Sequence, residues 1–407
     1  MTRFSGWLLL GLALALCTAA AWTAGAPRML PGMPPVVDPD NLYSEAGAGK
    51  LSPATAGALN RVYVPNLRSN DVYVIDPATR KVVDVFPVGS TPQHVVPSWD
   101  LKTLWVANNG RRKTEGSLTP IDPTTGKPGP AVPVADPYNL YFTPDGKYAI
   151  VVAERLRELS FRDPHTMEVE GSIAVPDCAG VNHADFSIDG RYAIFTCEFH
   201  NRISRLARRG ERASLTDPAT CSGGDSLIKV DMVDRKVVAA LTLSHGGMPQ
   251  DIRISPDGKV FYVADMHADG VFVIDGDKFT EIGFIPTGRG THGLYPSRDG
   301  TKLYVANRGS HNTRGAPHGP GSISVIDFKT RQVVANWPIP GGGSPDMGNV
   351  SADGRHLWLS GRYDDVVYDI DTESGGVSEI PVGREPHGLT VWPQPGRYSL
   401  GHTGNMR

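Results

Sequence analysis

Residues 251–286, with the sequence DIRISPDGKVFYVADMHADGVFVIDGDKFTEIGFIP, contain four short apolar segments separated by turns. The segments are 251–255, 260–264, 270–275 and 279–286, and apolar residues recur at alternate positions in each. Their period of two and their content of Val, Ile, Tyr and Phe indicate strands rather than helices. The SPDG turn after the first segment suits a tight connection, because Gly258 can adopt a positive φ without a Cβ clash. The segment is therefore predicted to form one four-stranded antiparallel sheet.

Two sequence markers show that this unit is repeated along the chain. An apolar strand that ends in Asp recurs at Asp76, Asp122, Asp163, Asp231, Asp275, Asp327 and Asp371. A turn of the form Ser/Thr-x-Asp-Gly recurs at Asp145, Asp189, Asp257, Asp299 and Asp353, with an imperfect copy at Asp100. Both markers share a period of about 44 residues and the same two longer intervals, which is typical of a repeat architecture.

The two ends of the repeat region predict how the units are joined. A single four-stranded sheet has two apolar faces and two open edges, and radial stacking of several sheets buries the faces and protects the edges. The repeats begin at 61–65 (RVYVP), which matches a second strand, and end at 385–393 (EPHGLTVWP), which matches a first strand. The predicted fold is therefore an all-β, seven-bladed β-propeller over residues 59–396, closed by the C-terminal strand joining the N-terminal blade.

The repeat sequences also carry a family resemblance. RVYVPN…VYVID, LWVANN, FYVAD and LYVANRG…ISVID resemble the YVTN-repeat β-propeller family, which includes YncE-like periplasmic proteins. The resemblance covers 60–393 and implies the propeller fold. It implies little about activity, because the superfamily includes binding proteins, propeller lactonases and the haem-carrying propeller of cytochrome-type nitrite reductases.

The N-terminal residues predict export. Arg3 precedes an eleven-residue apolar run at 7–17, and small residues follow at 19–21. This is the anatomy of a signal peptide (1–21), and the run is shorter than the roughly 20 residues that span a bilayer. A Pro/Gly/Ala-rich leader (22–58) and a C-terminal tail (397–407) are expected to flank the propeller, in a periplasmic or secreted protein with no transmembrane segment after signal removal.

Cysteine content and net charge limit the partners. Removal of the signal leaves Cys178, Cys197 and Cys221, and an oxidising compartment favours one disulfide and one spare thiol. Sequence alone cannot assign the pair; Cys178–Cys221 is the pairing we favour. Lys and Arg number 40 against 43 Asp and Glu, for a net charge of −3. No basic field is available for nucleic acid, so nucleic-acid binding is not expected.

The repeat alignment places a ring of polar residues at one mouth of the central channel, because antiparallel neighbours bring the start of the first strand beside the end of the second. The predicted ligand-binding residues are His94, His183, Asp251, His292, Asp346 and His387 at first-strand starts, and Asn66, Asn108, Glu154, Glu198, Asp265 and Asn307 at second-strand ends. The candidate metal ligands among them are His183, His292, His387, Glu198 and Asp265, since imidazole and carboxylate bind divalent metals. The alternative is that these residues hydrogen-bond to neighbouring loops and are structural.

The two long intervals correspond to insertions at 199–224 and 308–320, which are expected to emerge on the same mouth. They are either tolerated surface loops or a wall for docking a partner. The function we favour is a binding or scaffold protein of the cell envelope that uses this mouth for an envelope protein or small ligand. The alternatives are a metal-assisted lactonase-like hydrolase or lyase, and a propeller that carries haem or another tetrapyrrole in the channel. A divalent metal or haem is the cofactor that these alternatives require.

Overall fold

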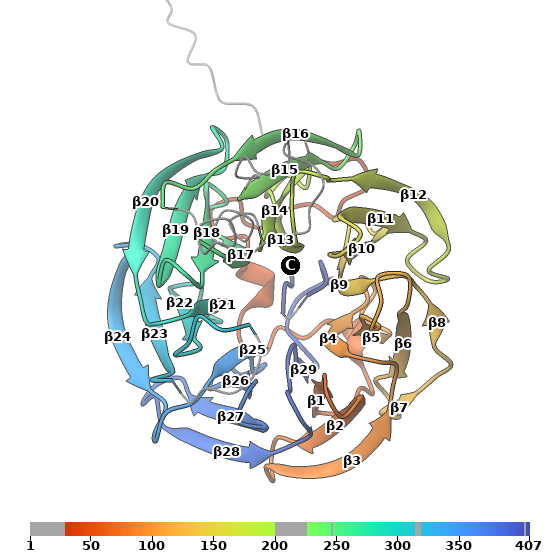
Figure 1. Ribbon diagram of the computed structural model, residues 1–407, viewed down its shortest axis with the longest axis vertical. Coiled ribbons are helices and arrows are strands. Elements are labelled where there is room, and N and C mark those ends of the chain that lie inside the picture. Colours follow the sequence, from red (N-terminus) through yellow and green to blue (C-terminus); the bar gives the residue numbers. More distant parts are fainter. Residues whose placement is uncertain (1–28, 200–225, 246, 314–318, 403) are drawn as a thin grey trace, which may run out of the picture.

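Seven antiparallel sheets surround a central axis in the part of the chain that the structure describes (Figure 1). Six have four strands, and in the seventh two short strands, both paired with the third strand, take the place of the fourth. The structure is a computed structural model, and it describes residues 29–199, 226–245, 247–313, 319–402 and 404–407. In each blade the first strand lies nearest the axis and the fourth lies on the rim. The predicted all-β, seven-bladed propeller is confirmed.

We number the blades from the one that contains β1. In blades 2 to 7 the strands follow chain order from the axis to the rim, whereas in blade 1 the C-terminal β29 comes first. Blade 1 contains β29 (Thr390–Trp392), β1 (Arg61–Asn66), β2 (Asp71–Asp76) and β3 (Lys81–Pro87). Blade 2 contains β4 (Pro92–Pro97), β5 (Leu104–Asn108), β6 (Ser117–Asp122), β7 (Lys127–Pro128) and β8 (Val132–Pro133), and blade 3 contains β9 (Pro137–Phe142), β10 (Ala149–Ala153), β11 (Glu158–Arg162) and β12 (Val169–Ala174). Blade 4 contains β13 (Val181–Phe186), β14 (Tyr192–Cys197), β15 (Leu227–Asp231) and β16 (Lys236–Leu241), and blade 5 contains β17 (Pro249–Ile254), β18 (Val260–Asp265), β19 (Gly270–Asp275) and β20 (Thr280–Pro286). Blade 6 contains β21 (Thr291–Pro296), β22 (Lys302–Asn307), β23 (Ser322–Asp327) and β24 (Gln332–Pro338), and blade 7 contains β25 (Pro345–Val350), β26 (His356–Gly361), β27 (Val366–Asp371) and β28 (Val377–Pro381).

The ring is closed by strands from opposite ends of the chain. β29 pairs antiparallel with β1, with Val391 opposite Val62 and Thr390 opposite Tyr63. This pairing confirms the predicted closure, and it removes the open edges that blade 1 and the C-terminal strand would otherwise present.

Apolar side chains from adjacent blades pack against each other and hold the ring together. Ile252, Val263 and Phe272 of blade 5 form one buried cluster with Ile194 and Leu227 of blade 4. Burying a side chain of this size contributes about 1.5–3 kcal/mol. Alternate residues of each strand reach such clusters, which is why the period of two in the sequence predicted the strands.

The disulfide differs from the predicted pairing. Cys178 is bonded to Cys197, with 4.9 Å between their Cα atoms, so the prediction of Cys178–Cys221 is wrong. Cys178 lies just before β13 and Cys197 ends β14, and the antiparallel pairing of these strands sets Val181 opposite Cys197. The hairpin therefore brings the two cysteines together. Cys221 and most of the 199–224 insertion lie outside the described residues.

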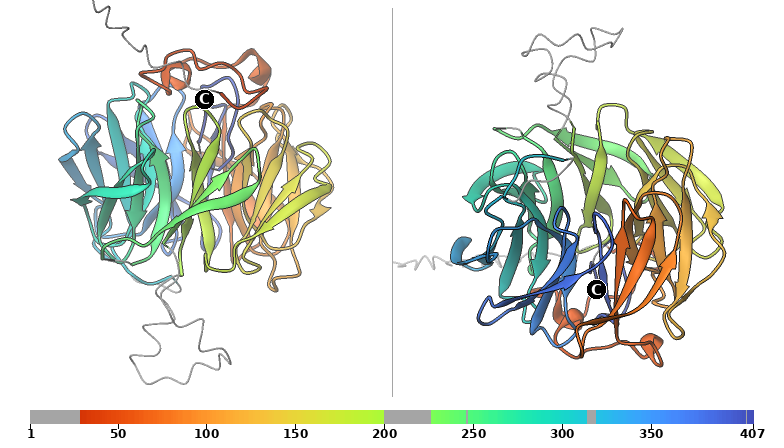
Figure 2. Two further views of the ribbon diagram at one scale, coloured as in Figure 1. Left: turned by 90° about the horizontal axis from the view of Figure 1, so that it is seen from above. Right: turned by 60° about the horizontal axis from the view of Figure 1, so that its bottom comes forward.

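The leader and the C-terminal tail cover the same face of the ring, which we call the turn face because the Asp-Gly turns lie there (Figure 2, left). The leader contains two short 3-10 helices, η1 (Ser44–Ala46) and η2 (Pro53–Thr55). Its backbone amides at Leu30, Leu42 and Gly49 donate to turn carbonyls of blades 4, 5 and 7, at 2.8, 2.8 and 2.9 Å. Within the described ranges, no helix has the length and apolar character needed to cross a membrane.

Candidate functional site in the central channel

The inner strands share a local irregularity that shapes the channel. In β4, β13, β17, β21 and β25 the pairing with the next strand shifts register just after the first residue. Such a bulge redirects successive side chains that would otherwise point to opposite faces of the sheet. In β13, Asn182 reaches Glu198 at 2.8 Å while the next residue, His183, contacts a histidine ring from the tail with 4.4 Å between centroids.

Five imidazoles meet on the axis as a result, and we call them the axial histidines: His94, His183, His292, His387 and His402. Four come from inner strands or the segment entering β29, and His402 comes from the C-terminal tail. Neighbouring ring centroids lie between 4.4 and 6.3 Å apart. Each of the five residues is no more than 1% exposed.

Burial keeps these rings neutral. It lowers the pKa of His94, His183 and His402 well below the ordinary value, and the neighbouring imidazoles and Arg253 act in the same direction. Burial followed by the charge of Arg308 lowers the pKa of His292 to about 4. Neutral imidazoles at physiological pH offer lone pairs to a ligand or a metal.

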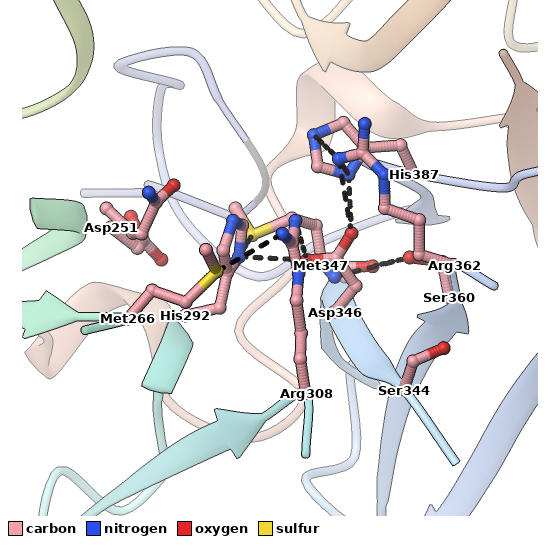
Figure 3. A network of polar contacts seen from close by, with 12 residues as sticks. Asp251, Met266, His292, Arg308, Ser344, Asp346, Met347, Ser360, Arg362 and His387 are labelled. Atoms are coloured by element: carbon pink, nitrogen blue, oxygen red, sulfur yellow. Dashed lines mark hydrogen bonds and ion pairs between the residues drawn. The ribbon is translucent and has the colours of Figure 1, made fainter. Parts of the chain in front are cut away.

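One side of the channel is organised around Asp346, as Figure 3 shows. Its carboxylate accepts hydrogen bonds from Nδ1 of His292 at 2.8 Å and from Nδ1 of His387 at 2.7 Å. Nε of Arg308 donates to it at 2.8 Å, and Nη1 of Arg362 lies 3.6 Å away. Burial alone would raise the pKa of Asp346, but Arg308 and the two histidines hold it well below the usual range.

The opposite side of the mouth holds two carboxyl groups, those of Glu154 and Glu198. They are 8% and 9% exposed, more than any axial histidine, so solvent reaches the channel from this side. Burial and then the charge of Glu198 raise the pKa of Glu154 well above its ordinary value, and burial also raises the pKa of Glu198. Two buried like charges repel each other, so the raised pKa of Glu154 favours its neutral form beside Glu198.

Four of the residues selected at second-strand ends lie away from the axis and stabilise hairpins. Asn66, Asn108 and Asn307 donate from Nδ2 to side chains of the following strand, at 2.9 to 3.2 Å. Asp265 accepts from the backbone amides of Met248, His267 and Ala268 at 2.8 to 3.0 Å. A glycine packs on each of these side chains, and an added Cβ there would lie within 2.1 to 2.7 Å.

The mouth is lined instead by the residue that follows each second-strand end. Glu154, Glu198, Met266, Arg308 and Arg362 occupy this position, just after Ala153, Cys197, Asp265, Asn307 and Gly361. In four of them the backbone amide donates to the segment before the inner strand, at 2.8 to 3.1 Å. The repeat alignment did not separate the last residue of the second strand from the residue that follows it. Because successive side chains of a strand point to opposite faces of the sheet, an offset of one residue places the side chain on the other face.

The structure therefore brings His94, His183, His292, His387, Asp251, Asp346, Glu154 and Glu198 to the channel and leaves Asn66, Asn108, Asp265 and Asn307 in the blades. Sequence reasoning missed His402, because the tail lies outside the repeats. It also missed Arg308 and Met266, which an alignment shifted by one residue would have found. Arg308 donates from Nη1 to the sulfur of Met266 at 3.5 Å.

A tetrapyrrole does not fit among the axial histidines. Ring centroids separated by 4.4 to 6.3 Å leave no space for a macrocycle between them, and His402 fills the axis from the turn face. A single ion does fit: among the described residues, His183, Asp251 and His402 present ligand atoms that all lie within 4.8 Å of one another.

The fold and this channel define a seven-bladed propeller with a buried cluster of polar side chains on its axis. We call this cluster, the axial histidines with Asp251 and Asp346, the axial chamber. The family model of the YNCE-like beta-propeller matches residues 15–163 and 211–395, so the chain belongs to that family.

Individual relatives are distant. The chain is 22% identical over 342 residues to the uncharacterized protein YncE of Salmonella typhi, covering 79% of this chain and 85% of that one. Among solved structures, the periplasmic gluconolactonase PpgL of Pseudomonas aeruginosa is similar with a TM-score of 0.59 and 18% identity, over 81% of this chain and 98% of PpgL. The dihydro-heme d1 dehydrogenase NirN is similar with a TM-score of 0.56 and 15% identity, over 82% of this chain and 75% of NirN. At these identities the structural likeness concerns the fold alone.

Proposed function

We propose that this protein is a periplasmic or secreted binding protein that takes a small guest into the axial chamber through the mouth lined by Glu154, Glu198, Arg308 and Arg362. One observation carries the proposal. Both ring nitrogens of His94 and Nε2 of His183 are buried without a hydrogen-bond partner among the described residues. Leaving a buried polar atom unpaired costs about 1–3 kcal/mol, and a guest that supplies partners would recover that cost.

The covering of the turn face supports entry from the mouth. The leader and tail cover the turn face, and Arg407 of the tail donates to the buried Asp185 at 2.8 Å. The groups that retain solvent exposure are the acidic and basic side chains of the mouth. They provide both hydrogen-bond donors and acceptors for a polar guest.

The test is to export the protein, purify it without chelator, and analyse it by native mass spectrometry and elemental analysis. A guest that is retained by the wild type and lost from His94→Ala and His183→Ala would support the proposal. His165→Ala is the matched control, because His165 is exposed on the outer rim. Protein that carries no guest, and whose thermal midpoint is unchanged by a panel of ions and small metabolites, would refute it.

A second candidate function is hydrolysis of a lactone. The observation that favours it is the pair of nearly buried carboxyl groups at the mouth, Glu154 and Glu198, both with a raised pKa. A neutral carboxyl group can protonate the carbonyl oxygen of an ester while a carboxylate activates water. Glucono-δ-lactone is the probe. Turnover that Glu154→Gln and Glu198→Gln abolish and His165→Ala retains would support hydrolysis, and a rate equal to the uncatalysed rate would exclude it for this probe.

A further inference from the structure

The innermost part of the chamber is built by two inner strands and the C-terminal tail. Asp251 of β17 lies 3.5 Å from Nε2 of His402, and the ring of His402 lies 4.4 Å from that of His183. All three residues are fully buried. The Asn139 amide contacts Nδ1 of His402 at 2.8 Å and Nδ1 of His183 at 3.3 Å, which fixes both ring planes.

We propose that His183, Asp251 and His402 bind one first-row transition-metal ion such as Zn²⁺ or Cu²⁺, with His94 facing its fourth position. The proposal rests on the proposed function, because it names the guest of the same chamber. Two imidazoles and one carboxylate form a donor set that suits these ions.

The ring separations agree with a single ion. A ligating ring nitrogen lies about 2.0–2.1 Å from Zn²⁺, so two rings on one tetrahedral ion have centroids roughly 5 Å apart. The centroids of His183 and His402 are 4.4 Å apart, those of His94 and His402 are 5.0 Å apart, and those of His94 and His183 are 5.7 Å apart. Nε2 of His183 and both nitrogens of His94 have no partner within the described part of the chain.

The neighbouring groups distinguish this place from the Asp346 side of the channel. Asp346 contacts two guanidinium groups, Arg308 and Arg362, and these exclude a further cation. Among the described residues Asp251 has one arginine partner, Arg253. Oδ1 of Asp251 accepts from Nη1 of Arg253 and from the amide of Ile252, both at 2.9 Å, and Oδ2 accepts from the amide of Leu294 at 2.9 Å. The carboxylate is thus held in place with a lone pair left on Oδ2.

Two glycines allow the tail to approach the inner strands closely enough to place His402 among the axial histidines. Gly401 has a φ of +89°, and a Cβ there would lie 2.4 Å from the carbonyl oxygen of Leu140. Gly404 has a φ of +75° and packs on Asn349. The amide of His402 donates to the carbonyl of Leu140 at 3.0 Å, and the amide of Phe142 donates to the carbonyl of Leu400 at 3.0 Å, so the tail is fixed to β9.

Asn139 provides a sharp test of which ring atoms bind the ion. If Nε2 of each imidazole binds the metal, each ring carries its proton on Nδ1, facing an amide nitrogen of Asn139 that cannot accept it. The Asn139 oxygen already accepts from the amide of Leu140 at 2.9 Å. An Asn139→Asp variant keeps that acceptor and adds a second one, and a carboxylate behind the imidazole strengthens metal binding. We therefore expect Asn139→Asp to bind the ion about 10-fold more tightly.

The experiment titrates Zn²⁺ and Cu²⁺ into the full-length exported protein, stripped with a chelator, in competition with a chromophoric chelator. The expected result is one ion per chain, nitrogen couplings in the Cu²⁺ electron paramagnetic resonance spectrum, and a higher thermal midpoint with the ion. His183→Gln and His402→Gln should each lower affinity by more than the roughly 10–100-fold that loss of an outer partner costs. His165→Gln should bind as the wild type, and circular dichroism with the thermal midpoint of each metal-free variant shows that it is folded.

The outcomes separate this inference from the function on which it rests. Absence of 1:1 binding, equal binding by folded His402→Gln, or unchanged or weaker binding by Asn139→Asp would overturn the inference. If no metal binds but the wild type carries an organic guest that His94→Ala loses, the inference fails and the binding function stands. If neither metal nor guest is bound, both fail.

Discussion

Asp346 is the residue whose removal should be most costly to the folded ring. Asp346→Ala would leave Arg308, whose side chain is 3% exposed, without its carboxylate partner and would remove the carboxylate acceptor of Nδ1 of His292 and of His387. Breaking a buried charge pair costs about 3–5 kcal/mol. Two unpaired imidazole donors add roughly 1 kcal/mol each. We expect the free energy of unfolding to fall by about 5–7 kcal/mol at pH 7.

The assay is equilibrium unfolding in urea, followed by circular dichroism and tryptophan fluorescence. Asp234→Ala is the control, because Asp234 forms an exposed pair with Lys236 at 2.9 Å and its loss should have no measurable effect. The double variant Asp346→Ala with Arg308→Met should recover part of the loss, because the unpaired charge is removed as well. A change of less than about 1 kcal/mol in Asp346→Ala would refute the reasoning.

The pH dependence of the same variant has a definite sign. The pKa of Asp346 in the folded chain is lower than in the unfolded chain, so its contribution is present above the unfolded value and is lost as the pH falls through the folded one. The difference between wild type and Asp346→Ala should therefore persist from pH 7 down to about pH 4 and shrink under stronger acid. A difference that grew on acidification would contradict the assignment of Asp346 as a carboxylate.

Three further predictions concern closure, the acidic pair and the disulfide. A chain truncated after Gly383 loses β29 and should unfold well below the wild-type midpoint, whereas a chain that retains β29 and lacks only the later residues should lose less; equal stability of both would contradict closure by β29. The raised pKa of Glu154 beside Glu198 means that wild-type stability falls as pH rises from the ordinary range of a glutamate through the folded value. Glu154→Gln should flatten this fall in urea unfolding at pH 5–9, and an unchanged profile would contradict the raised pKa of Glu154. Cys178→Ser should lower the free energy of unfolding by about 2–4 kcal/mol and release a free Cys197 thiol to a thiol reagent in denaturant, whereas an equally stable variant would show that this bond does not stabilise the ring.

The repeats predict the fold because every blade must meet the same packing and turn requirements. Each strand must place alternate apolar residues against a neighbouring blade, and each hairpin needs a turn that tolerates positive φ, as at Gly258 with φ +71°. These requirements recur with the repeat and are visible in a single sequence. Closure was also predictable, because 61–65 and 385–393 are incomplete units that complement each other.

The detailed lining of the channel was less accessible to sequence reasoning. At a strand end, one residue separates Asn307, which is bonded within its blade, from Arg308, which reaches Asp346. Both are polar, so a repeat alignment cannot tell which one faces the axis; the register of the bulged strands decides it. The prediction of the disulfide was wrong for a similar reason. The pairing of Cys178 with Cys197 depends on the β13–β14 hairpin rather than on the spacing of the cysteines in the sequence.

The C-terminal tail connects the closure of the ring with the axial site. The strand that closes the ring, β29, ends on the turn face, so the residues after it start beside the opening of the channel on that side. A chain that stopped there would leave the axial histidines accessible from both faces. Instead, the tail enters, places His402 among them and pairs Arg407 with Asp185. Closure of the fold and closure of the chamber therefore depend on the same segment. A ligand that contacts His402 should stabilise the ring as a whole. Displacement of the tail would open the chamber and would at the same time weaken the support that the tail gives to β29.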